Sequence, residues 1–104
     1  YRVIAIDPRG QGYSAKTVDG NDYLTHGRDV AGLIDALGLE DIVLIGWSTG
    51  NLDTWSYVQQ FGKDKLRGVV TIDMSPLPLS PDPKWWTEGT IEELSGRHTG
   101  VDFF

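Results

Sequence analysis

A serine between two glycines lies in Gly46-Trp47-Ser48-Thr49-Gly50, directly after the apolar run Ile42-Val43-Leu44-Ile45 and before a helix-compatible stretch. Such a serine sits at a strained turn with its hydroxyl exposed, because the flanking glycines avoid collisions with the neighbouring backbone. The amide of Thr49, at the start of the helix, would point to where an oxyanion develops during acyl transfer. The pattern predicts a nucleophile elbow, with Ser48 as the nucleophile and the Thr49 N–H as an oxyanion donor.

A serine nucleophile needs a base and an acid, and the sequence offers few candidates. His26 lies in the first turn of a predicted helix and fits packing or capping better than catalysis. His98 lies in the C-terminal tail, and the sequence does not show whether it approaches Ser48. Asp73 ends the strand that follows the nucleophile helix, where its carboxylate could orient a histidine or cap the turn at 74–76.

Large apolar side chains could line a pocket beside the serine. Trp47 is adjacent to the nucleophile, and we expect it to line the acyl pocket, although a tryptophan can also be a core residue. Leu77, Leu79, Trp85 and Trp86 could form an apolar lid over the nucleophile or bury themselves against the sheet.

Two other patterns carry weaker chemistry. The stretch Gly10-Gln11-Gly12-Tyr13-Ser14-Ala15 satisfies a dinucleotide-binding string, but a helix should open within it, and the polar loop to Asn21 does not look helical. Glu92 and Glu93 are neighbours on a short predicted helix, so they diverge by about 100° and do not form a glycosidase pair. We therefore expect no cofactor and no metal.

The elements that must position these residues alternate between strand and helix. Asp22 is the predicted N-cap of the first helix, and Gly38 its stop. This order predicts an α/β fold with parallel strands and right-handed crossovers. The predicted elements are a buried strand over 1–7, a helix from Asp22 to Gly38, a strand over 41–45, a helix over 51–61 and a strand over 68–73.

The composition excludes several classes of protein. The chain has 104 residues, which suffice for one small domain, and no cysteine, which excludes disulfides and thiolate metal sites. A net charge of −6 disfavours nucleic acid as a partner. Its apolar runs are far shorter than a membrane span, and no leader opens the chain. We expect a soluble, cytoplasmic protein.

The elbow and a second motif together resemble the α/β-hydrolase superfamily. Asp7-x-Arg9-Gly10-x-Gly12-x-Ser14 matches the loop after the fourth strand of that superfamily, and Leu37-Gly38-Leu39 also fits. The resemblance covers about residues 1–78. Within the superfamily the chain looks most similar to the cofactor-free non-haem chloroperoxidase and esterase group, in which a string like Asp102-Phe103-Phe104 occurs in the cap.

The resemblance assigns Ser48 as nucleophile and the Thr49 amide as one oxyanion donor. Some members place the triad acid at the position of Asp73, although its usual place follows a later strand. The second oxyanion amide of the superfamily lies upstream of Tyr1 and the catalytic histidine downstream of Phe104, so we expect the base outside this chain.

The resemblance also implies an incomplete sheet. The superfamily has a further strand between those at 2–7 and 41–45, which would leave an unfilled slot here with unpaired backbone groups. We therefore expect an internal fragment, with a partial α/β-hydrolase core over 1–74 and the start of a cap or lid over 75–104. Asp7 and Arg9 are expected to fix their loop by hydrogen bonds and to pair with each other.

These inferences predict a serine hydrolase that acts on carboxylic esters or related small acyl compounds. If the chloroperoxidase resemblance holds, hydrogen peroxide could replace water and yield a peracid. The alternatives are a non-catalytic small-molecule binding protein of the same fold and an inert fragment that lacks its histidine. The sequence does not set the oligomeric state.

Overall fold

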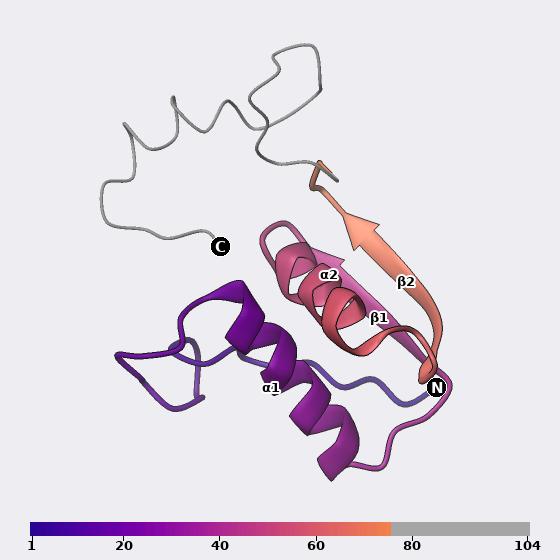
Figure 1. Ribbon diagram of the computed structural model, residues 1–104, viewed down its shortest axis with the longest axis horizontal. Coiled ribbons are helices and arrows are strands. Elements are labelled where there is room, and N and C mark those ends of the chain that lie inside the picture. Colours follow the sequence, from indigo (N-terminus) through magenta and orange to yellow (C-terminus); the bar gives the residue numbers. More distant parts are fainter. Residues whose placement is uncertain (76–104) are drawn as a thin grey trace.

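The computed structural model describes residues 1–75, which form two helices and two strands. The elements are α1 (Tyr23–Ala36), β1 (Ile42–Trp47), α2 (Gly50–Phe61) and β2 (Leu66–Ile72) (Figure 1). The strands pair in parallel, with Ile45 beside Val70 and Trp47 beside Ile72. Four of the five elements predicted over residues 1–73 are therefore confirmed, and α2 is the crossover between two parallel strands.

Local signals at both ends explain α1. The Asp22 side chain accepts a hydrogen bond from the Thr25 N–H at 2.8 Å, so the predicted N-cap is confirmed. Gly38 has φ +59°, a left-handed conformation that glycine adopts without steric cost just after a helix end.

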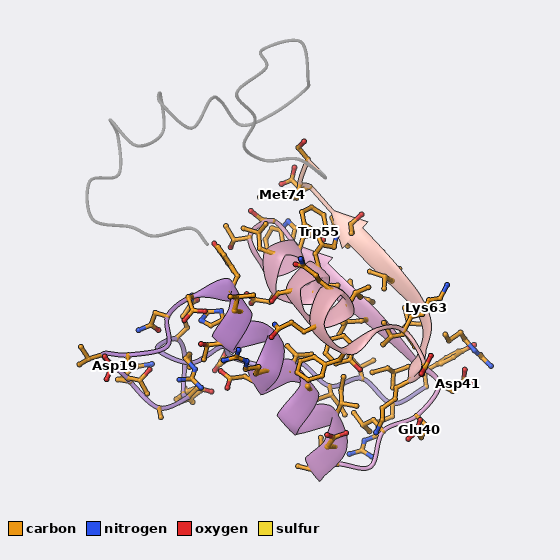
Figure 2. All side chains as sticks on the ribbon, in the orientation of Figure 1. Asp19, Glu40, Asp41, Trp55, Lys63 and Met74 are labelled. Carbon is orange, nitrogen blue, oxygen red and sulfur yellow. The ribbon has the colours of Figure 1, made fainter. Side chains whose placement is uncertain are left out.

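The core lies where the two helices meet each other and one face of the sheet (Figure 1). Alternate side chains of β1 turn toward the helices, and the side chains between them are exposed. Figure 2 places Asp41 and Lys63, before the two strands, at one end of the sheet and Met74, after β2, at the other. The buried core residues are Val30, Ala31, Ile34 and Tyr57, with Leu39, Ile42, Leu44, Val58 and Leu66 packed around them.

The strand predicted over residues 1–7 is wrong for this structure. The segment is exposed throughout and belongs to no strand, and β1 forms its ladder with β2. A β-branched run favours an extended backbone, but a strand also needs a partner for its N–H and C=O groups. Within residues 1–75 the segment has no such partner.

Candidate active site

The backbone at Ser48 has the geometry of a sharp strand-to-helix turn. Ser48 follows the last residue of β1 and has φ +52°, in the left-handed region that L-residues rarely adopt. Its N–H donates to the Ile72 carbonyl at 2.9 Å, and its own carbonyl accepts from the Asn51 N–H at 3.0 Å. The strained turn expected at the elbow is therefore present, and contacts to β2 and α2 hold it in place.

One of the two flanking glycines is sterically required. A Cβ built on Gly46 would lie 2.7 Å from the Cα of Asn51, which is closer than real Cβ contacts come. A Cβ on Gly50 meets nothing within 4 Å among the described atoms. The expectation that both glycines prevent a collision is confirmed for Gly46, and within residues 1–75 nothing supports it for Gly50.

The two groups expected to do the chemistry are free of partners within residues 1–75. Ser48 is half-buried, and its hydroxyl makes no hydrogen bond to the described residues. The exposed Thr49 is the N-cap of α2, and its N–H makes no hydrogen bond to them either. A hydroxyl and an amide donor are thus both available beside one helix N-terminus.

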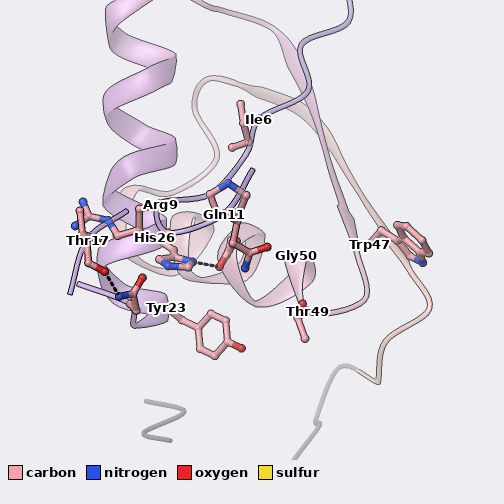
Figure 3. Close-up of a pocket in the computed structure, with 13 residues that line it drawn as sticks. Ile6, Arg9, Gln11, Thr17, Tyr23, His26, Trp47, Thr49 and Gly50 are labelled. Carbon is pink, nitrogen blue, oxygen red and sulfur yellow. Dashed lines mark hydrogen bonds and ion pairs between the residues drawn. The ribbon is translucent and has the colours of Figure 1, made fainter. Parts of the chain in front are cut away.

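A cavity of about 700 Å³ lies at the carboxyl edge of the sheet, between Ile6 and Trp47 (Figure 3). Thr49 and Trp47 contribute to its wall, and Ser48 is not among its lining residues. The indole of Trp47 is 70% exposed and points away from Tyr23 and His26 in Figure 3. Ile6 of the 1–7 segment and Trp47 of β1 thus border the same cavity, next to the place where the resemblance to the superfamily implies an open slot.

A histidine–aspartate pair in the wall of this cavity escaped the sequence analysis (Figure 3). His26 Nδ1 lies 3.0 Å from Asp53 Oδ1, and the two side chains are 12% and 15% exposed. Burial raises the pKa of the Asp53 carboxyl, while the charge of His26 acts in the opposite direction. His26 Nε2 is buried and makes no hydrogen bond within the described part of the chain.

The expected pairing between Asp7 and Arg9 is wrong. Arg9 donates from Nε and Nη2 to the two carboxylate oxygens of Asp29 on α1, both at 2.6 Å. The hydrogen-bonded guanidinium holds the pKa of the Asp29 carboxyl below its usual range. Asp7 instead accepts a hydrogen bond from the Tyr13 N–H at 2.8 Å, so it fixes the loop as expected.

Asp73 follows Ile72, whose carbonyl accepts the Ser48 N–H, so the two chain segments meet at the edge of the sheet. Asp73 is exposed and has φ +56°. Its carboxylate makes no hydrogen bond to residues 1–75, which leaves both the acid role and the cap role as predictions.

The predicted cap or lid region over 75–104 lies almost entirely outside the described residues. The lid residues Leu77, Leu79, Trp85 and Trp86, and His98, lie outside the described residues.

Among residues 1–75 no cluster of three metal-ligating side chains is present, and neither helix there has the length and apolar character to cross a bilayer.

Comparison with known proteins identifies the family. The family model described as alpha/beta hydrolase fold matches residues 1–102. The chain therefore belongs to the α/β-hydrolase fold family, and the parallel strands with a crossover helix fit that fold. The resemblance found in the elbow and in the loop motif is confirmed.

Its relatives include non-haem haloperoxidases and esterases. The chain is 40% identical to a non-heme haloperoxidase of Rhodococcus erythropolis over 97% of its own length and 37% of that protein. It is 36% identical to a bifunctional esterase/perhydrolase of Acinetobacter calcoaceticus, over 90% of this chain and 34% of the relative. Its structure resembles an esterase from Exiguobacterium antarcticum with a TM-score of 0.74 and 25% identity, covering 86% of this chain and 34% of that one. The chain spans about a third of the length of each.

Proposed function

We propose that this chain carries the nucleophile of a serine hydrolase that acts on carboxylic esters or related small acyl compounds. The observation that carries the proposal is Ser48 in a left-handed turn between β1 and α2, with its hydroxyl unbonded within residues 1–75. The Thr49 N–H, also unbonded there, is the oxyanion donor beside it.

In this mechanism the Ser48 Oγ attacks the acyl carbonyl carbon and a histidine outside the described residues takes its proton. The Thr49 N–H stabilises the oxyanion of the tetrahedral intermediate, which collapses as the alcohol leaves with that proton. Water then attacks the acyl-enzyme, the carboxylic acid departs, and the serine regains its proton. Asp73 is the proposed acid that orients the histidine, and its position beside the elbow supports that role.

Hydrogen peroxide in place of water would give a peracid in the second step, with the same bonds formed and broken. The match to an esterase/perhydrolase and to a non-heme haloperoxidase supports this second activity. Neither step routes through a cofactor.

A fluorophosphonate probe tests the proposal on the intact natural protein that carries this sequence. We expect labelling of the wild type at Ser48, none in Ser48→Ala, and parallel loss of p-nitrophenyl acetate hydrolysis. A folded wild type that is neither labelled nor active contradicts the proposal and favours a binding protein of the same fold. Asp73→Asn tests the acid separately, and we expect a fall in kcat of at least about 100-fold if Asp73 holds the histidine.

A further inference from the structure

Local hydrogen bonds in the first turn of α2 end on the Ser48, Thr49 and Gly50 carbonyls, and none of those within residues 1–75 holds the Thr49 N–H. The Thr49 side chain makes no capping hydrogen bond, and Gly50 is the first helical residue. An uncapped turn that starts with glycine is intrinsically weak, because glycine loses more backbone freedom than other residues on folding. The direction of the Thr49 N–H therefore depends on tertiary contacts to the residues just after it.

On the side of the sheet, Asn51 supplies those contacts. Its side chain is fully buried, and its Nδ2 donates to the carbonyls of Ser48 and Ile72, both at 2.9 Å. These bonds tie the elbow to the end of β2. Both bonds lie toward β2, whereas the contact of this part of α2 with α1 is made by a different residue.

On the side of α1, the contact is the His26–Asp53 pair. Asp53 lies one helical turn after Thr49, and its Oδ1 is 3.0 Å from Nδ1 of His26. The two side chains are mostly buried, so the hydrogen bond between Nδ1 and the Asp53 carboxyl persists only while the two helices keep their spacing. The pair and Thr49 both border the cavity at the carboxyl edge (Figure 3).

The turn of α1 that carries His26 also contacts α2 at two further points. Gln60 Nε2 donates to the Leu24 carbonyl at 2.9 Å. Gly27 lies so close to α2 that an added Cβ would be 2.9 Å from the Ser56 carbonyl carbon. α1 therefore presents the imidazole to Asp53 where the two helices pack closely.

We propose that His26 is a positioning residue that acts through Asp53 to aim the Thr49 amide at the oxyanion. This inference rests on the proposed function, because it assigns a second residue to the same site. It requires no change in the protonation of His26 during the reaction. The His26 imidazole fixes the position of the first turn of α2 through Asp53, and that turn sets the direction of the Thr49 N–H.

Three variants of the intact protein separate this role from simple packing. His26→Phe keeps the ring volume and removes the donor to Asp53, whereas His26→Asn keeps an N–H near the position of Nδ1. Asp35→Asn is the matched control, since it breaks the exposed Lys65–Asp35 ion pair between α1 and the start of β2. For hydrolysis of p-nitrophenyl acetate, we expect kcat to fall about 10-fold in His26→Phe with KM unchanged, and His26→Asn and Asp35→Asn to stay near wild type.

Inhibition by an oxyanion-forming compound tests whether the fall in kcat arises from weaker stabilisation of the oxyanion. A trifluoromethyl ketone forms an adduct with an anionic oxygen, so its Ki should rise about 10-fold in His26→Phe, in step with kcat. If His26→Phe binds substrate and the ketone more weakly by the same factor, the positioning role is overturned. It is also overturned if kcat and Ki are both unchanged from wild type. If His26→Phe does not fold, Asp53→Ala breaks the same contact and must show the same loss of kcat. A wild type that is inert to both ester and fluorophosphonate overturns the proposed function instead.

Discussion

Ser48 shows how one residue can be held in a conformation that its type disfavours. A left-handed backbone costs an L-residue roughly 1–2 kcal/mol relative to glycine. The hydrogen bond that Ser48 donates to the Ile72 carbonyl and those that it accepts from Asn51 offset that cost and fix the serine where the strand becomes the helix. Strain of this kind at a hydroxyl without a hydrogen-bond partner in residues 1–75 supports the proposed catalytic role of Ser48.

Replacing Ser48 by glycine should relieve the strain. We expect Ser48→Gly to be more stable to urea than Ser48→Ala by up to about 1 kcal/mol, because only alanine retains a Cβ in the left-handed region. Both variants lose the hydroxyl, so the comparison isolates the backbone term. Equal stability of the two would show that the turn is unstrained.

The two glycines of the elbow should respond in opposite directions. Gly46→Ala places a methyl group 2.7 Å from the Asn51 Cα, and we expect a loss of roughly 1–3 kcal/mol in the free energy of unfolding. Gly50→Ala enters open space at the first helical position, where alanine is the better helix former. Urea unfolding of both variants should show Gly50→Ala at or above the stability of wild type. A destabilised Gly50→Ala would mean that atoms outside residues 1–75 crowd this position.

At the scale of elements, the sequence predicted what local signals determine. The cap at Asp22 and the stop at Gly38 delimit α1, so its bounds were predictable from neighbouring residues. The β-branched run at 1–7 carries the same local preference as β1 but forms no ladder, since strand pairing depends on residues distant in sequence. Local preference was enough to predict the helix, whereas a strand also requires a partner strand for its backbone hydrogen bonds.

The same distinction applies to the candidate site. The elbow is contiguous in sequence, so Ser48 and Thr49 could be singled out from their neighbours. The Arg9–Asp29 and His26–Asp53 contacts join residues 20 and 27 positions apart across separate elements. Nothing in the composition or periodicity of either segment marks those partners, because the contact depends on where α1 lies against the loop and against α2.

The Arg9–Asp29 contact links the loop after the 1–7 segment to α1, and its effect should depend on pH. The pKa of Asp29 is lowered from 3.8 in the folded state. The stabilisation of the fold by the ionised Asp29 carboxylate is therefore present above pH 3.8 and is lost as the pH falls through the lower folded pKa. We therefore expect the stability gap between wild type and Asp29→Asn to shrink on acidification. Urea unfolding between pH 2 and pH 7 measures it.

Asp53 supplies a contrast of opposite sign. Its pKa is raised from 3.8, so the native carboxyl holds its proton at pH values where the unfolded one has lost it. The stability of wild type relative to Asp53→Asn should fall as the pH rises from 3.8 through the raised pKa. A gap that moves in the same direction for both variants would contradict the opposite shifts of the two carboxyls.

At the scale of the whole molecule, the outer face of the sheet is apolar and uncovered within residues 1–75. The side chains facing away from the helices there belong to Val43, Ile45 and Trp47 of β1 and to Val70 and Ile72 of β2, and they are 42–70% exposed. Parallel sheets are normally covered on both faces. The chain spans about a third of the length of these relatives.

The apolar face that residues 1–75 leave uncovered should make the 104-residue chain associate with itself when it is produced alone. Ile45 lies beside Val70 in the middle of that face, so Ile45→Lys places a charge where two copies would meet. We expect sedimentation velocity to show assemblies for the wild-type chain and a shift toward monomer for Ile45→Lys. Leu24→Lys, on α1, is the control, because Leu24 is 48% exposed and lies away from the sheet, and it should leave association unchanged.

In a longer protein whose remaining segments cover the face, the effect reverses, since Ile45→Lys would then bury a charge and lower stability by several kcal/mol. A monomeric wild-type chain, or equal effects of the two lysines, would show that the sheet face does not drive association.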